Sequence, residues 1–199
     1  MERNFELALN DWLATLSSRE KGDLDECHCG MLAALRYVQL DTNLLYAAVN
    51  FWNPETHCFC FREKEITPLP EELGAIIVWP ADGLPCLFLG LDSRALRKIV
   101  HGREIDLIAL VEHFKTVDAR RKVYRRRALV LCLFARFLFA NNDPSVGHAS
   151  LITIVEQCEA GRNPMPLCAG ELFMTLDRLK RDPHAPWASC PYLLQVQLS

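Results

Sequence analysis

Hydrophobic residues recur every three or four positions along most of this chain, a spacing that places them on one face of a helix. Phe5, Leu9 and Trp12 follow it and predict an amphipathic helix over residues 4–17. The same pattern predicts a succession of further helices. They are expected at residues 31–38, 42–52, 70–79, 93–101, 105–114, 118–140, 151–160, 166–180 and 187–198.

Residues 19–30 interrupt this pattern. They are rich in charge and contain Gly22 and Gly30, which predicts a polar loop that carries Cys27-His28-Cys29. The helix expected at residues 42–52 should be capped by Asp41 or Thr42, since a side-chain oxygen can accept from a first-turn amide. Its buried stripe is expected to consist of Leu44, Ala48 and Phe51.

Residues 51–73 combine a helix end, a short hairpin and a new helix start. Pro54 disfavours helical backbone at Asn53, so the chain is expected to turn there. The two rings of Phe59 and Phe61 alternate with Cys58 and Cys60, which is strand periodicity. The residues of this signature that we expect to be architectural are Trp52, Pro54, Phe59, Phe61, Pro68, Glu71 and Glu72.

The predicted fold class is therefore mainly α, an irregular multi-helix domain with one small β-hairpin near residues 57–67. The chain has 199 residues, of which 50% are apolar, enough for one domain with a substantial core. We expect residues 1–199 to form that single domain.

The order of motifs resembles the plant mobile domain family, whose domain has a helix ending in Phe-Trp-Asp/Asn-Pro, then an aromatic strand, then a Thr-Pro-x-x-Glu-Glu helix start. Three further blocks resemble the same family, at residues 127–141, 170–179 and 189–196. The resemblance covers about residues 31–196. It implies a transposon-associated plant protein of the nucleus or nucleocytoplasm, with relatives linked to silencing, and no settled chemistry.

The chain departs from the family's pattern at several positions. Leu69 stands where the family usually has threonine, which removes a helix cap worth about 1 kcal/mol. Ala140 replaces a usual proline, and Gln197 a usual tryptophan. Family members typically continue through further helices, so we expect this chain to be an incomplete plant mobile domain.

A basic segment precedes the apolar run of the predicted 118–140 helix. Such a segment could contact phosphate groups or a partner protein, or serve as an import signal, or simply be the solvated entrance of a helix. The net charge of the chain is −3, and the acids of residues 1–30 could neutralise the segment in cis. Its basic residues are Arg120, Arg121, Lys122, Arg125, Arg126 and Arg127.

Cysteine and histidine gather at two places and could hold zinc, a possible but unfavoured cofactor. The candidate ligands are Cys27, Cys29, Cys58, Cys60 and His57. Structural zinc sites favour Cys-x2–4-Cys spacing, and the spacing here is shorter. A nucleophilic pair of His57 and Cys58 is disfavoured because adjacent strand residues point to opposite faces. Ordinary reduced thiols are the alternative.

Single residues complete the expectations for the core. Arg136 lies in an apolar run and needs a carboxylate, helix-end carbonyls or an exposed position. Trp52, Trp79 and Trp187 are expected to anchor the core. Leu193, Leu194 and Leu198 are expected to expose an apolar face that drives self-association.

The first residues have neither a basic n-region nor an apolar h-region, so we expect a nuclear or cytoplasmic protein that is not secreted. The longest apolar run, residues 128–140, is shorter than the roughly 20 residues that span a bilayer, which predicts no membrane association. The leading hypothesis is a non-enzymatic, transposon-derived interaction module. Alternatives are a nucleic-acid-binding protein that uses residues 120–127 and a zinc-dependent protein.

Overall fold

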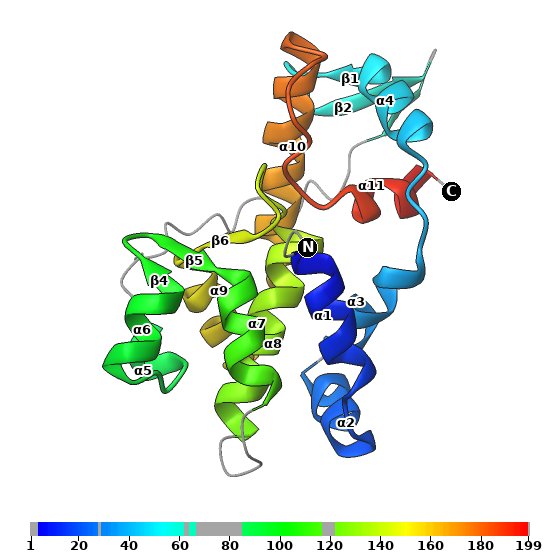
Figure 1. The fold of residues 1–199 in the computed structure, drawn as a ribbon. Helices are drawn as coiled ribbons and strands as arrows, with labels where there is room; N and C mark the ends of the chain where they lie inside the picture. Colours follow the sequence, from blue (N-terminus) through cyan, green and yellow to red (C-terminus); the bar gives the residue numbers. More distant parts are fainter. Residues whose placement is uncertain (1–3, 28, 62–63, 67–84, 117–121, 199) are drawn as a thin grey trace.

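The computed structural model describes residues 4–27, 29–61, 64–66, 85–116 and 122–198. The described chain is mainly helical, as the sequence predicts (Figure 1). Its longer helices are α1 (Phe5–Ala14), α2 (Ser18–Glu26), α4 (Thr42–Phe51), α7 (Leu107–Lys115), α8 (Lys122–Leu133), α9 (Ser150–Glu159), α10 (Met165–Arg181) and α11 (Pro191–Leu198). Shorter ones are α3 (Gly30–Ala34), α5 (Pro85–Phe88), α6 (Ser93–Ile99) and the 3-10 turn η1 (Leu35–Tyr37).

The first predicted helix forms but is shorter than expected, since it ends at Ala14. Asn4 begins it by accepting a hydrogen bond from the Glu6 amide at 2.8 Å. Phe5, Leu9 and Trp12 are buried on one face, and Trp12 has no exposed surface. Helix α1 packs mainly against α7, which makes it part of the core.

The predicted loop at residues 19–30 is wrong, because residues 18–26 form helix α2. Ser17 and Glu20 make a capping box in which each side chain accepts from the other's backbone amide. This box offsets the roughly 1 kcal/mol that Gly22 costs inside a helix. Leu24 is the one residue of α2 that is buried, so the hydrophobic pattern gave little sign of this helix.

Helix α4 begins at the predicted cap, where Asp41 accepts from the Leu44 amide at 3.0 Å. Its predicted stripe is partly wrong. Ala48 is buried, but the other core residues are Leu45 and Val49, while Phe51 is 45% exposed. The stripe is rotated because the helix faces both α10 and α11.

The chain leaves α4 directly into a small sheet. Strand β1 (Trp52–Asn53) pairs antiparallel with β2 (Cys58–Phe61), with Trp52 opposite Phe59. Strand β2 pairs with β3 (Lys64–Ile66), which confirms the predicted hairpin. Strand β1 adds a third strand that was not predicted. The signature residues Pro68, Glu71 and Glu72 lie outside the described residues, as does Trp79.

A second three-stranded sheet in the described part of the chain was not predicted. Its strands are β4 (Val100–His101), β5 (Glu104–Asp106) and β6 (Val146–His148). Strand β5 takes the first residues expected to be helical, and Asp106 then caps α7 by accepting from the Ala109 amide at 2.8 Å. Each strand has at most three residues, too few for a visible alternation of polar and apolar positions.

The helix predicted from residue 118 is described from Lys122 onwards. Its apolar half is buried from Ala128 to Leu133 and continues into a π-helical turn, η4 (Phe134–Leu138). Arg136 of this turn reaches the Glu6 carboxylate at 3.2 Å, which confirms the expected carboxylate partner.

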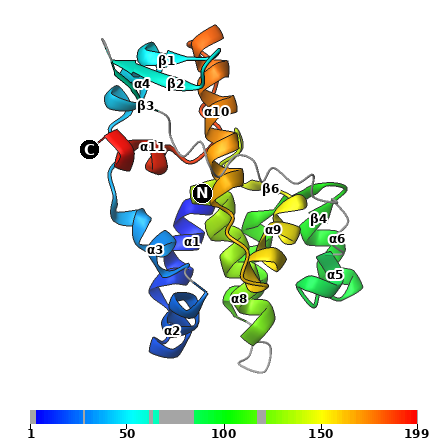
Figure 2. The same ribbon diagram turned by 180° about the vertical axis from the view of Figure 1, so that it is seen from behind.

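Two hydrophobic clusters make up the core of the described residues, and α10 contributes to both (Figures 1 and 2). Cys168 of α10 lies in the larger cluster, which α1, α7, α8 and α9 also fill. Leu172 and Leu176, one and two turns later, lie in the smaller cluster with α4 and the first sheet. Leu194 of α11 is also fully buried there, so its predicted exposure is wrong. The side chains of Leu193 and Leu198 lie outside the described part.

Candidate interaction surface

The basic segment enters the structure at the start of α8. Lys122 and Val123 are exposed, whereas Arg125, Arg126 and Arg127 are partly buried. Successive residues point about 100° apart around a helix, so the three arginines reach different neighbouring elements. Arg120 and Arg121 lie outside the described residues.

Arg125 ties three helices together. Its Nε donates to Oε1 of Glu20 on α2 at 2.7 Å, and its Nη1 donates to the Phe114 and Lys115 carbonyls, the latter at 2.8 Å. These carbonyls lie at the end of α7, where the regular helical hydrogen bonds stop. The guanidinium also lies 5.2 Å from the ring centre of Trp12, and the side chain is only 13% exposed. Arg125 is therefore a structural residue.

Glu20 takes part in both the capping box and this ion pair. Partial burial acts to raise the pKa of its carboxyl, but hydrogen bonds from the Ser17 amide and hydroxyl and from Arg125 bring the pKa below its ordinary value. Glu20 thus stays ionised at neutral pH. An acid from residues 1–30 does neutralise part of the basic segment in cis, as proposed from the sequence.

The next two arginines share the Glu159 carboxylate at the end of α9. Arg126 Nη2 lies 3.1 Å from Oε1, and Arg127 approaches Oε2 with Nη2 at 2.9 Å. Arg127 also donates to the Phe88 carbonyl at 3.1 Å and lies 4.6 Å from the centre of that ring. The carboxylate therefore links α8 to α9, and Arg127 links α8 to α5.

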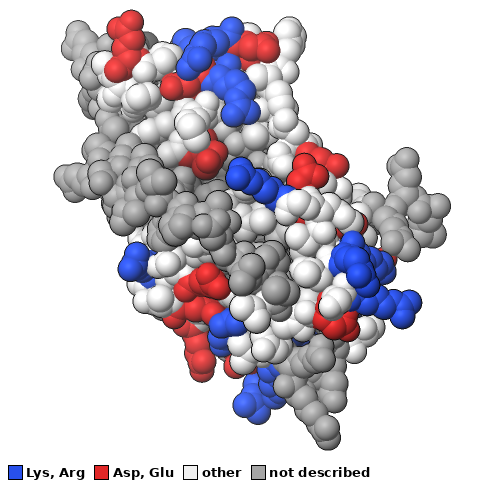
Figure 3. Space-filling view, turned by 90° about the vertical axis from the view of Figure 1, so that its left-hand side faces the viewer, with Lys and Arg blue, Asp and Glu red and all other residues white. Residues whose placement is uncertain are grey.

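These contacts use most of the charge of the described basic segment. A phosphate group that engaged all three guanidiniums would compete with Glu20 and Glu159. On the face shown in Figure 3, Lys and Arg side chains are intermixed with Asp and Glu among uncharged residues. The most open surface at the start of α8 consists of Lys122 and Val123, and the Arg126 side chain is 35% exposed beside them.

The five candidate zinc ligands do not come together. Cys27 and Cys29 flank the turn between α2 and α3, beside the larger cluster. Cys58 and Cys60 lie on β2 at the opposite end of the molecule (Figure 1). Within the described ranges, no group of three or more histidine, cysteine, aspartate or glutamate residues could hold a metal ion.

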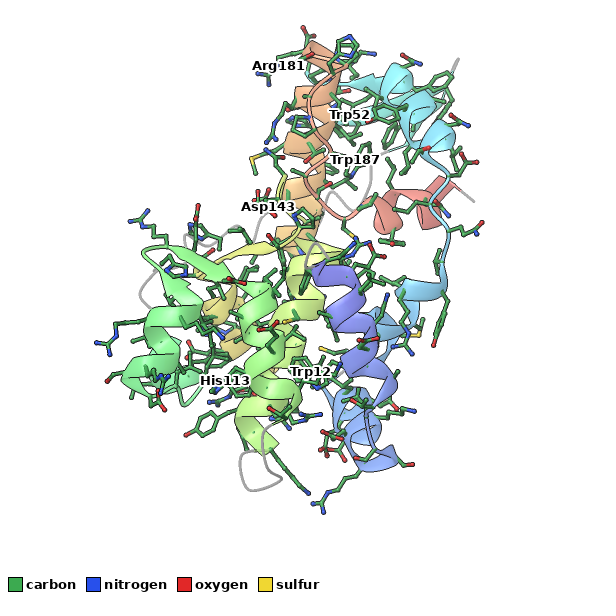
Figure 4. The ribbon with its side chains drawn as sticks, viewed as in Figure 1. Trp12, Trp52, His113, Asp143, Arg181 and Trp187 are labelled. Carbon is green, nitrogen blue, oxygen red and sulfur yellow. The ribbon has the colours of Figure 1, made fainter. Side chains whose placement is uncertain are left out.

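His57 and Trp52 instead share a carboxylate. Trp52 Nε1 donates to Oδ1 of Asp177 at 2.7 Å, and His57 Nε2 lies 3.4 Å from Oδ2. The rings of Trp52 and His57 both pack on Phe173, with ring centres 5.2 and 5.9 Å away. Trp52 is 2% exposed, which confirms it as a core anchor. Figure 4 shows Trp12 and Trp52 in opposite halves of the molecule, so each cluster has its own buried tryptophan.

A cavity of about 470 Å³ brings together polar residues that the sequence analysis did not single out. His148 Nδ1 lies 2.7 Å from Ser150 Oγ and also accepts from the Ser150 amide at 3.3 Å, so it caps the first turn of α9. Burial raises the pKa of Glu171, and the buried Ser189 hydroxyl has no hydrogen-bond partner among the described atoms. His-x-Ser spacing is common in turns, so no sequence signal could have marked this cavity.

Comparison with known proteins gives a partial similarity. Over 123 residues, 54% of this chain and 9% of the relative, the sequence is 29% identical to "Serine/threonine-protein phosphatase 7 long form homolog" of Arabidopsis thaliana. The chain therefore spans 9% of the length of this curated relative. No family model matches the chain, and no solved structure matches it.

No helix in the described part of the chain combines the length and the apolar character needed to cross a membrane.

Proposed function

We propose that this chain is a non-enzymatic interaction module of the plant mobile domain type, derived from transposon sequence, that binds a partner protein in the nucleus. The partial similarity to a plant protein supports the family assignment. The predominantly helical fold and the architectural place of Trp52 and Phe59 agree with it.

The observation that carries the proposal is the exposure of three large apolar side chains within one short segment, which comprises α3, η1 and the residue after it. Met31 is 78% exposed and Tyr37 75%, and Val38 is exposed as well. On the other side of the same segment, Leu32 and Leu35 pack against the larger cluster and hold it in place. Several large apolar side chains exposed to solvent on one segment are typical of protein interaction sites.

Contact with nucleic acid is the second candidate, and the geometry favours it less. Arg125, Arg126 and Arg127 are held by carboxylates and backbone carbonyls. Lys122 and the partly exposed, ion-paired Arg126 would supply little of the counterion release that drives binding to phosphate backbones.

The proposal is tested by capture from nuclease-treated plant nuclear extract. A chain with Met31→Ser, Tyr37→Ser and Val38→Ser should lose the captured protein, while Met174→Ser, a control at an apolar residue that is 53% exposed on α10, should keep it. Equal capture by both variants would contradict the proposal. Binding to DNA or RNA that falls steeply with salt, and that disappears in a Lys122→Ala, Arg126→Ala chain with an unchanged circular dichroism spectrum, would establish the second candidate instead.

A further inference from the structure

Three thiols line one apolar cleft in the lower half of the molecule. The cleft has a volume of about 430 Å³ and lies between the α2–α3 turn, the η4 turn and the junction of α9 with α10. Sites for small organic molecules typically measure about 300–1,000 Å³. Its thiols are Cys27, Cys29 and Cys158, and its apolar walls include Leu32, Phe134, Leu138 and Met165.

The α2–α3 turn fixes the first two thiols. The Cys29 amide donates to the Leu24 carbonyl at 2.9 Å, which closes the turn. Cys27 Sγ donates to the same carbonyl at 3.2 Å, and Cys29 Sγ donates to the Cys27 carbonyl at 3.3 Å. Cys29 is 4% exposed, whereas Cys27 and Cys158 are half-buried. Solvent and ligands therefore reach Cys27 more readily than Cys29.

The surroundings separate the acidities of the three thiols. The neighbouring Cys29 side chain and amide lower the pKa of Cys27 to about 7 against the effect of burial, and the charge of Arg126 on α8 helps. The interaction with Cys27 and burial raise the pKa of Cys29. Burial and the charge of Cys27 raise the pKa of Cys158 to about 11. Arg162, which follows α9, also lines the cleft.

We propose that this cleft is a covalent capture site in which Cys27 adds to α,β-unsaturated carbonyl compounds that carry an apolar chain. The sulfur attacks the β-carbon and forms a C–S bond. The electron pair of the carbon–carbon double bond moves onto the carbonyl oxygen as an enolate, and water then supplies a proton to the α-carbon. No oxidant or metal is needed, and the thioether that results leaves the carbonyl group intact.

The cleft selects the electrophile by its chain. Reactivity alone gives Cys27 a modest advantage. A pKa of about 7 rather than 9 raises the thiolate fraction at pH 7 roughly 50-fold. The thiolate of a more acidic thiol is less nucleophilic, which cancels about tenfold of this gain. The net advantage is about fivefold. Burying four additional methylene groups against Leu32, Phe134 and Leu138 could add up to the order of a hundredfold in binding. Chain length should therefore dominate the selectivity.

The test compares two enals that share the reactive group, trans-2-nonenal and trans-2-pentenal, on the full chain at pH 7. Adducts are reduced with borohydride and assigned by peptide mass mapping, and each rate is divided by that of free N-acetylcysteine. We expect nonenal to modify Cys27 first, at least about tenfold faster than pentenal. Leu32→Asn, at a half-buried residue of the cleft wall, should reduce this chain-length preference.

Matched variants locate the reaction. Cys27→Ser should abolish the fast adduct. Cys60 is a half-buried thiol on β2, and Cys60→Ser should leave the adduct unchanged. If Cys27→Ser does not fold, mapping on the unchanged chain still decides. Adducts spread evenly over the thiols, or equal relative rates for the two enals at Cys27, would overturn the proposal.

Discussion

Replacing Arg125 with alanine should destabilise the fold strongly, although the residue lies in a segment that looks like a binding patch. The substitution removes a charge-assisted pair with Glu20, at 2.7 Å, and the hydrogen bonds that end α7. Breaking a largely buried pair costs about 3–5 kcal/mol, and we take the lower end because Glu20 is 28% exposed and can rehydrate. About 3 kcal/mol corresponds to a fall in Tm of roughly 6–12 °C in a chain of this size.

The measurement is urea unfolding followed by far-ultraviolet circular dichroism, with Lys122→Ala as the control one turn away. Because Lys122 is exposed, its replacement should change stability by less than about 0.5 kcal/mol. Glu20→Gln preserves the capping box and removes the charge, so a double-mutant cycle with Arg125→Ala isolates the ion pair. An Arg125→Ala chain as stable as the control would refute the reasoning and leave the guanidinium available for ligands.

The pH dependence gives an independent check on the same pair. The folded-state pKa of Glu20 is lowered, so its stabilising contribution is present above the ordinary value of 4.5 and is lost as pH falls through the folded pKa. The difference between the unchanged chain and Arg125→Ala should therefore shrink when the pH falls below about 4.

Three further predictions concern other elements. Glu171→Gln should stabilise the chain at pH 7 and make no difference at pH 3, because burial raises the pKa of Glu171 and its ionisation opposes folding. A variant no more stable than the unchanged chain at pH 7 would contradict this. Trp52→Phe should cost about 2–4 kcal/mol in thermal or urea unfolding, since Asp177 loses its indole donor, and a loss below 1 kcal/mol would count against that hydrogen bond. Gly90→Ala should cost at least about 2 kcal/mol by the same assay, because Gly90 has a φ of +60° and a Cβ there would lie 2.6 Å from the Tyr124 ring; an unchanged midpoint would show that the loop can shift.

The sequence predicted those parts of the fold whose signals are local. Asp41 as a cap, Pro54 as a stop and the strand around Phe59 each depend on signals within a few residues, and the structure has all three. Helix α2 was also predictable, because Ser17 and Glu20 have capping-box spacing. The charged composition of residues 19–30 favoured a loop over this helix signal.

The parts that could not be predicted depend on partners far away in the chain. Strand β6 is defined by pairing of Gly147 with Ile105, more than 40 residues earlier. The role of Arg127 depends on Glu159, 32 residues away, which turns an apparent binding patch into a helix clamp. The cleft thiols belong to this class as well, because Cys27 and Cys158 meet only once α2 and α9 are in place.

Helix α10 couples the unfolding of the two hydrophobic clusters. Its Cys168 is buried in the larger cluster and its Leu172 in the smaller one, so neither cluster can separate from the other without exposing part of this helix. Local unfolding of the smaller cluster must therefore also disturb the packing of the larger cluster. Amide protons in the middle of α10 should be among the last to exchange with deuterated solvent, and both clusters should melt in a single cooperative event.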